Sequence, residues 1–278
     1  MGETVNTSNK KSHREKEMTF VEHLDELRIR LIRGVLAVFI FAVIAFFFKD
    51  FIFDTVILKP KTPEFITNRL MCRLGEMLNS NLCINTKGFQ IINIQLAGQF
   101  KAHLLVSFVF GLMFAFPVLI NQIWIFVKPA LNVKDIKNIN LVLFSVSVLF
   151  AVGILFSYFI IVPLTINFLS TYQVSTEVLN QISFSSYLSI ITGVTLAGGI
   201  IFELPVLIYF LAKIGLVTPG LLRKYRKHAI VVFFILSGII TPPDVFSQIL
   251  VAIPLYILYE ISIVITKRVV KNRIVSLD

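Results

Sequence analysis

Glu203 is the acidic residue whose position is hardest to explain as ordinary surface charge. It lies within an apolar segment, ten residues before Lys213, so a helix would place it about 15 Å from that lysine. An ionisable side chain at such a depth in a membrane is costly and is usually functional. We therefore expect Glu203 to make a polar contact in a cavity or with a partner helix. The alternative is a protonated carboxyl group that is satisfied inside the bundle.

Two further acids, Glu26 and Asp135, each stand next to an apolar segment and among basic residues. Alone, either would be an ordinary solvated charge. Together on one surface they would suit a basic peptide, because arginine binds carboxylates with two parallel hydrogen bonds. The sequence leaves open whether the two acids converge.

Other chemistry has little support in the sequence. It contains no G-x-S-x-G, Walker A or H-E-x-x-H motif, so nothing indicates an enzyme. No histidine stands four residues from another histidine or from a cysteine, so we expect no metal site and no cofactor. The isolated histidines are His13, His23, His103 and His228.

Cys72 and Cys83 lie in one polar segment and lack a zinc-binding pattern. If that segment is outside the cytoplasm, a disulfide closing this short loop would stabilise the fold by about 3 kcal/mol. We favour the disulfide over two free thiols.

The composition is that of a membrane protein. Apolar residues make up 56% of the 278 residues, charged residues only 15%, and the mean hydropathy is +0.84. Soluble proteins carry about a quarter charged residues. The net charge of +10 fits basic loops that contact anionic lipid, and no nucleic-acid-binding motif accompanies it.

Six apolar blocks predict an all-α integral membrane protein with six transmembrane helices. The fifth block has 12 residues and the sixth has 17, whereas a span needs about 20. The fifth could be re-entrant, or the last two helices could be short spans in a thinned bilayer. The blocks are residues 31–48, 104–127, 141–162, 188–212, 229–240 and 249–265.

Basic residues indicate how the chain crosses the membrane. The segments before residue 34, at 128–140, at 213–228 and after 266 hold seven, three, five and four lysines or arginines, whereas 163–187 and 241–248 hold none. The long segment 49–103 holds seven, but long loops cross the membrane largely regardless of charge. By the positive-inside rule this predicts six crossings with both termini cytoplasmic. We expect residues 1–18 to be a disordered tail, 19–267 one membrane domain with an outer loop at 49–103, and 268–278 a second tail. Glu260, seven residues before Lys267, should reach the cytoplasmic interface.

Five motifs in order resemble the TatC family, the multi-span subunits of the twin-arginine protein translocase. The resemblance covers residues 19 to about 267, and the outer loop departs from it by being longer and carrying the two cysteines. The motifs are HLDELRIRL (23–31), QIWIFVKPAL (122–131), FELPVLIYFLAKIGLVTP (202–219), LRKYRKHAIVV (222–232) and TPPDVFSQILVAIPLYILYE (241–260).

The resemblance implies a glove-shaped bundle with two short C-terminal spans in the bacterial inner membrane. It implies a receptor and core subunit that binds the twin-arginine signal peptides of folded cargo and assembles with single-span TatA/TatB-type subunits into an oligomeric complex. On matching positions it implies that the signal-peptide site contains Glu26, Arg28, Phe126, Pro129, Leu131 and Asp135. It implies contacts with partner subunits at Glu203, Thr241, Phe246 and Gln248.

Two other classes compete with this interpretation. A small secondary transporter could use Glu203 as its ion-coupling carboxylate, although the two halves show no internal repeat of the kind many transporters carry. An intramembrane enzyme would need the catalytic motifs that the sequence lacks.

Overall fold

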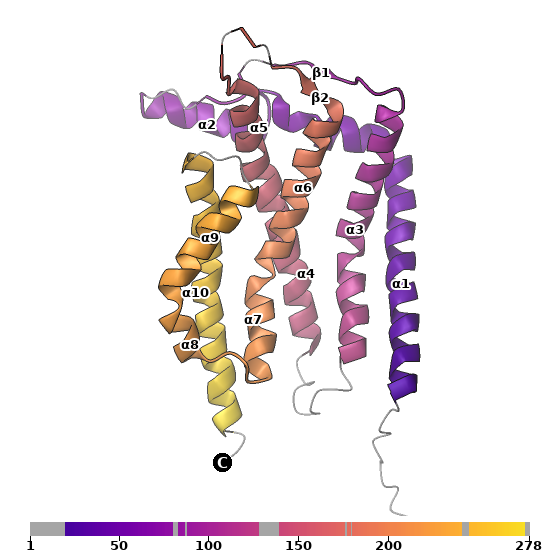
Figure 1. Cartoon of the computed structure of the whole chain (residues 1–278), viewed down its shortest axis with the longest axis vertical. Coiled ribbons are helices and arrows are strands. Elements are labelled where there is room, and N and C mark those ends of the chain that lie inside the picture. Colours follow the sequence, from indigo (N-terminus) through magenta and orange to yellow (C-terminus); the bar gives the residue numbers. More distant parts are fainter. Residues whose placement is uncertain are drawn as a thin grey trace, which may run out of the picture.

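The protein is a bundle of long helices with a small folded cap at one end (Figure 1). The computed structural model describes residues 20–79, 83–86, 88–127, 139–175, 177–178, 180–240 and 245–275. The predicted tail 1–18 and most of the predicted loop 128–140 lie outside the described residues. We call the end where α1 begins and α10 finishes the terminal end, and the opposite end the cap end.

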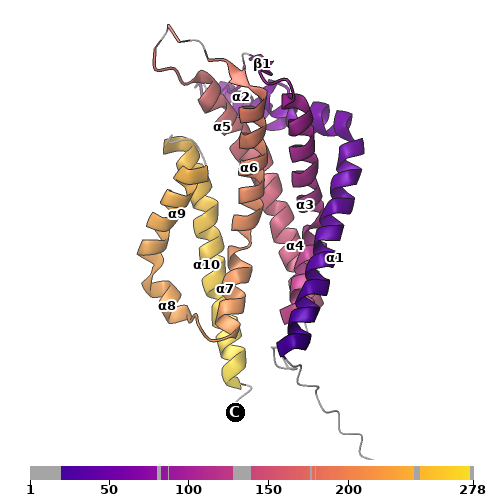
Figure 2. The same cartoon turned by 45° about the vertical axis from the view of Figure 1, so that its right-hand side comes forward.

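Long helices α1 and α3 form one side of the bundle. Helix α1 (Phe20–Phe47) joins the predicted amphipathic segment and the first apolar block into one continuous helix. Helix α3 (Gly98–Val127) begins six residues before the predicted block. The two helices pack along each other, at one edge of the bundle (Figures 1 and 2).

Two spans in the middle of the bundle are each built from more than one helix. Helix α4 (Ile139–Phe156) continues through the π-helix η5 (Ser157–Ile161) into α5 (Val162–Thr171). Pro163 lacks an amide hydrogen, so it cannot donate to the preceding turn, which accounts for the widened turn there. Helix α6 (Phe184–Phe202) continues as α7 (Leu204–Lys213).

The last helices form a hairpin beside α7. Helices α8 (Pro219–Lys224) and α9 (Arg226–Ile240) lead into α10 (Val245–Val275), which packs along α7. Helix α9 has 15 residues, and α9 and the start of α10 stop short of the cap end in both views (Figures 1 and 2). Helix α10 has 31 residues, far more than the apolar block predicts. Its basic last turns continue the helix because lysine and arginine are good helix formers, so residues 268–275 of the predicted tail are helical.

Five described helical stretches are long and apolar enough to cross a membrane, which makes the chain an all-α, multi-pass membrane protein. They correspond to the predicted blocks one to four and six. The fifth block is α9, which is shorter than a usual span, so the sixth crossing stays a prediction. The five stretches are Leu24–Phe47, Gly98–Phe126, Leu141–Thr171, Phe184–Lys213 and Gln248–Lys271.

The segment predicted as an outer loop is folded into the cap. It contains the π-helix η1 (Phe51–Ile57), the short 3-10 helix η2 (Lys59–Lys61), helix α2 (Ile66–Met77) and strand β1 (Ile91–Ile92). Strand β1 pairs in parallel with β2 (Ile182–Ser183), so that Ile91 is opposite Ile182. The cap therefore joins the first outer segment to the second.

Candidate functional site

Small residues let α1 and α3 approach closely and set their register. A Cβ atom added to Gly111 would lie 2.7 Å from the Cβ of Ala42, and one added to Gly34 would lie 3.0 Å from a methyl group of Leu119. The helices are antiparallel, so residue numbers on the two helices change in opposite directions. Continuing this register to the terminal end places Glu26 level with the last turn of α3.

Glu26 shares its carboxylate with Arg30, one turn further along α1. A guanidinium nitrogen of Arg30 donates to Oε1 of Glu26 at 3.2 Å, and each side chain is only about a fifth exposed (21% for Arg30, 19% for Glu26). Among the described residues, Oε2 of Glu26 and Nε of Arg30 are buried without a hydrogen-bond partner. A buried polar atom without a partner costs about 1–3 kcal/mol. Each side chain of the pair therefore keeps one polar atom without a described partner, and we call the pair half-satisfied. Oε2 of Glu26 could accept a hydrogen bond from a ligand, and Nε of Arg30 could donate one to it.

The other predicted residues of this site divide into described and undescribed ones. Arg28 is exposed on α1, and Phe126 is partly buried in the last turn of α3. The register of α1 and α3 brings Phe126 level with Glu26. Pro129, Leu131 and Asp135 lie outside the described residues, so the convergence of Glu26 and Asp135 stays a prediction.

More unpaired polar atoms lie on α3 near this end. The side-chain oxygen of Gln122 and the indole nitrogen of Trp124 are buried and have no hydrogen-bond partner among the described residues. The ring of Trp124 stacks on Phe210 of α7 with centroids 5.6 Å apart. Arg30 was not predicted to take part in the site, although a Glu–Arg pair four residues apart on one helix is a recognisable signal.

Glu203 occupies the break between α6 and α7. The backbone angles of Glu203 (φ −75°, ψ −3°) depart from those of a regular α-helix. Pro205, in the first turn of α7, has no amide hydrogen with which to continue the helical hydrogen bonds. Both carboxyl oxygens of Glu203 are buried without a hydrogen-bond partner among the described residues. The structure thus places an unpaired carboxyl group in the fourth span and pairs it with no described side chain.

Glycines bring α6 against α4 just before this break. A Cβ atom on Gly198 would overlap the hydroxyl oxygen of Ser157, and one on Gly153 would lie 2.7 Å from the carbonyl oxygen of Gly198. Small residues are the usual means by which membrane helices approach closely. This contact fixes the segment of α6 that carries Glu203.

An apolar cavity of about 490 Å³ lies between α3, α4, α6 and η1. At its cap end the hydroxyl group of Tyr158 donates to the carbonyl oxygen of Val56 at 2.7 Å. Thr195 adds a buried hydroxyl oxygen without a partner in the described part of the chain. Glu203 does not line this cavity, so the two features are separate.

Gln248 is engaged within the chain. Its side-chain nitrogen donates to the backbone oxygen of Phe234 in α9 at 2.8 Å. A Cβ atom on Gly238 would lie 3.3 Å from that nitrogen. The hydrogen bond joins α10 to α9 just after the turn. Thr241 lies outside the described residues, and Phe246 is described only by its place in α10.

Glu260 pairs across the last hairpin. Arg226 of α9 donates to one carboxylate oxygen at 2.6 Å, and Tyr256 donates to the other at 3.0 Å. The pair is partly exposed, with side chains 43% and 32% accessible. Glu260 thus holds α9 against α10.

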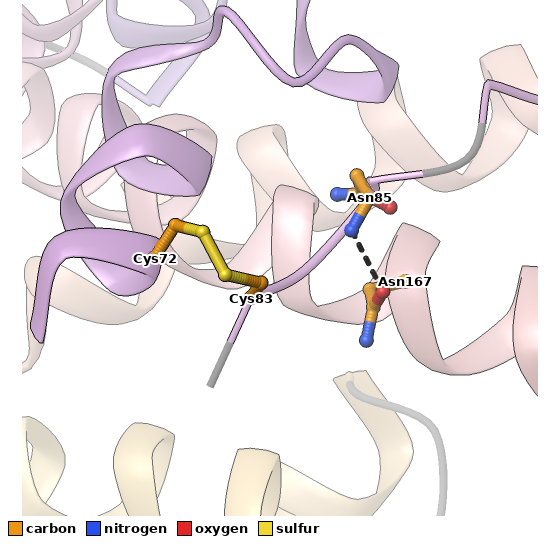
Figure 3. Close-up of a disulfide and its surroundings, with 4 residues drawn as sticks. All are labelled: Cys72, Cys83, Asn85 and Asn167. Carbon is orange, nitrogen blue, oxygen red and sulfur yellow. Dashed lines mark hydrogen bonds between the residues drawn. A yellow bond between two sulfur atoms is a disulfide. The ribbon is translucent and has the colours of Figure 1, made fainter. Parts of the chain in front are cut away.

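In the cap, Cys72 and Cys83 form a disulfide that joins α2 to the following segment (Figure 3). Two residues further on, the amide of Asn85 donates to the side-chain oxygen of Asn167 at 2.9 Å (Figure 3). Asn68 of α2, which is 2% exposed, accepts from the side chain of Asn85 at 3.3 Å. These contacts tie α2 to α5. No cluster of three or more potential metal ligands occurs among the described residues.

The comparison with known families decides the classification. The family model for the Sec-independent protein translocase protein TatC matches residues 22–254. The chain belongs to the TatC family. It is 39% identical to the TatC protein of Blattabacterium over 92% of this chain and 98% of that protein. It is 38% identical to the TatC protein of Desulforapulum autotrophicum over 91% of this chain and 86% of that protein.

Solved TatC structures have the same fold. A crystal structure of the twin-arginine translocase receptor TatC is 32% identical, with a TM-score of 0.64, and covers 90% of this chain and all of that one. Another, determined in DDM, is 33% identical, with a TM-score of 0.67 over 88% of this chain and 99% of that one. Membership confirms that this TatC protein is a translocase component rather than an enzyme, and it favours protein transport over a small-molecule transporter.

Proposed function

We propose that this TatC protein is the receptor and core subunit of its translocase, and that it binds twin-arginine signal peptides at the terminal end of α1 and α3. The observation that carries the proposal is the half-satisfied pair of Glu26 and Arg30. A peptide guanidinium group can donate to the free oxygen of Glu26, and the exposed Arg28 lies on the same turn.

Arginine suits this site better than lysine. Arg30 already occupies one oxygen of Glu26, so a ligand must approach the other oxygen in a fixed direction. A planar guanidinium group offers several donors in fixed geometry, whereas an ammonium group is a point charge. A second acid, Asp135 in the segment that follows α3, would hold the second arginine. Phe126, Pro129 and Leu131 would line the site between the acids.

We propose that both termini are cytoplasmic and that the membrane is the bacterial inner membrane. The described basic residues on α1, α8 and the last turns of α10 lie at the terminal end, and the disulfide lies at the cap end. The cap segment 49–103 also holds lysines and arginines, but long loops cross the membrane largely regardless of charge. Positive residues favour the cytoplasmic side, and disulfides persist outside the reducing cytoplasm. Signal peptides would then reach Glu26 from the side on which cargo folds.

Single-span subunits of the TatA/TatB type are the proposed partners in the membrane, within an oligomeric complex. Glu203 supports this role because its carboxyl group is buried without a partner in the described part of the chain. A polar group on a partner helix would satisfy it, since polar contacts join helices in membranes. Thr241, Phe246 and Gln248 would form a second contact near the turn before α10.

The signal-peptide proposal is tested by binding a fluorescent twin-arginine peptide to the full chain in nanodiscs. Glu26→Gln keeps the shape and removes the charge, so it deletes one charge-assisted hydrogen bond, worth about 1.5–3 kcal/mol. We expect the dissociation constant to rise by about 10- to 100-fold. Asp25→Asn is the matched control, because Asp25 is the exposed neighbouring acid and its loss changes the net charge equally.

The control should change the dissociation constant by less than about twofold, because exposed charges contribute little. Equal weakening by both substitutions would mean that the peptide responds only to net charge. Unchanged binding by the Glu26→Gln variant would remove Glu26 from the site.

A further inference from the structure

Helix α2 carries an apolar stripe that the described residues of the chain leave uncovered. Ile66, Leu70, Leu74 and Met77 follow one another at spacings of four, four and three, which places them along one face of a helix. Their side chains are 41–80% exposed. Isolated exposed apolar residues need no explanation, but a continuous stripe marks an interaction surface.

The other faces of α2 are accounted for. Asn68 and Gly75 are buried on the face toward the bundle, and the disulfide at Cys72 leaves from the same side. Arg69 and Glu76 are exposed on the remaining flank. At about 100° per residue, the apolar stripe lies nearly opposite the face that contacts the bundle, and the charged flank lies about 100° around the helix from both.

Contacts on either flank give the direction of the stripe. The hydroxyl group of Thr67, beside the stripe, donates to the backbone oxygen of Phe159 in η5. Asn68, away from the stripe, accepts from the side-chain nitrogen of Asn85, which also donates to the backbone oxygen of Pro163 at 3.1 Å. Pro163 lies four residues, or about 6 Å, nearer the cap end than Phe159. The stripe therefore lies on the side of α2 that is nearer the mid-height of the spanning helices. The charged flank lies on the side farther from it.

The orientation of α2 agrees with this arrangement. Helix α2 lies across the cap end at a steep angle to the spanning helices (Figure 1). A helix in the plane of a bilayer surface has an apolar face toward the acyl chains and a polar face toward water. Arg73, exposed at the edge of the stripe, is placed to contact lipid phosphates, because arginine binds phosphate well.

We propose that α2 is an interfacial membrane helix, with its apolar stripe inserted among the phospholipids of the leaflet at the cap end. The disulfide and the contacts of Asn68 and Asn85 hold it at that depth. The inference depends on the chain being a multi-pass membrane protein and not on the proposed receptor role. The stripe faces the hydrocarbon layer, and the opposite face of α2 is already held against the bundle. Phospholipid is therefore favoured over a protein partner.

The test measures the depth of three positions in the full chain, reconstituted in phosphatidylethanolamine–phosphatidylglycerol vesicles. Single cysteines replace Ile66 or Met77 on the stripe, or Glu76 on the charged flank as the control, and each is labelled with an NBD fluorophore. The native cysteines are already bonded, and peptide mapping without reductant verifies that they stay so. Quenching is measured with doxyl-labelled lipid and with aqueous iodide.

Because an interfacial helix inserts its apolar face about 5–10 Å below the headgroups, we expect doxyl quenching at positions 66 and 77 to exceed that at 76 at least about twofold. Iodide should quench position 76 most. Equal iodide quenching at all three positions would place the stripe in water and overturn the proposal. Protection of positions 66 and 77 from both quenchers would assign the stripe to a protein contact and would also overturn it.

Discussion

Replacement of Gly198 by alanine should separate α6 from α4 and weaken the bundle. The added methyl group would overlap the hydroxyl oxygen of Ser157, would lie 2.7 Å from the Cβ atom of that residue and would lie 3.2 Å from the carbonyl oxygen of Gly153. Ser157 is fully buried, so neither helix can give way without moving backbone. Overpacking of this kind costs about 1–3 kcal/mol.

Gly193→Ala is the matched control on the same helix. Its Cβ atom would meet nothing within 4 Å, so only the higher helix propensity of alanine acts, worth up to about 1 kcal/mol. Both substitutions share that gain, so the difference between the two variants isolates the steric cost. We expect Gly198→Ala to be less stable than Gly193→Ala by about 1–3 kcal/mol.

The assay is reversible unfolding of the purified protein in mixed micelles of increasing SDS content, followed by circular dichroism. A second variant combines Gly198→Ala with Ser157→Gly, which moves the glycine to the facing span. We expect it to recover most of the lost free energy of unfolding. Equal stability of the Gly198→Ala and Gly193→Ala proteins would refute the close contact between α4 and α6.

Two further predictions concern the cap and the last hairpin. Replacement of Cys72 and Cys83 by serine should lower the free energy of unfolding by about 3 kcal/mol for a loop of this length, and a reductant should do the same to the wild-type protein but not to the variant. Unchanged stability after reduction would show that the disulfide adds nothing. Gln248→Ala removes the hydrogen bond from α10 to the backbone of α9 and should cost about 1 kcal/mol in the same assay, and a cost below a few tenths would contradict this role.

Much of the bundle could be predicted because long apolar runs can satisfy their backbone in a membrane only as helices. The short fifth block appears as the 15-residue α9. The break at Glu203 was not predicted as a boundary between two helices, although Pro205 two residues later is a recognisable signal. The length of α10 was missed because its basic last turns have no apolar pattern.

The cap could not be predicted to the same degree because its order comes from contacts between distant residues. Asn85 reaches Asn167 across 82 positions, and Tyr187 donates to Ile57 across 130. Polar pairs of this kind leave no periodic pattern in one sequence. Helix α2 is an exception, since the spacing of its apolar residues could have been recognised.

In the candidate site, the sequence identified Glu26 from its charge and its place beside a span. It did not show that Arg30 occupies one oxygen of that carboxylate. Glu203 was identified for the opposite reason, because a carboxyl group among apolar residues is conspicuous without any structure.

The most direct test of the receptor role is photocrosslinking of a twin-arginine signal peptide to the full chain. Phe126→p-benzoylphenylalanine places the probe level with Glu26, and the same probe at Phe47, which is 79% exposed at the other end of α1, is the control. We predict that the peptide crosslinks at position 126 and not at 47, and that the crosslink disappears when both peptide arginines become lysines. Equal crosslinking of the lysine peptide, or crosslinking only at position 47, would contradict the account.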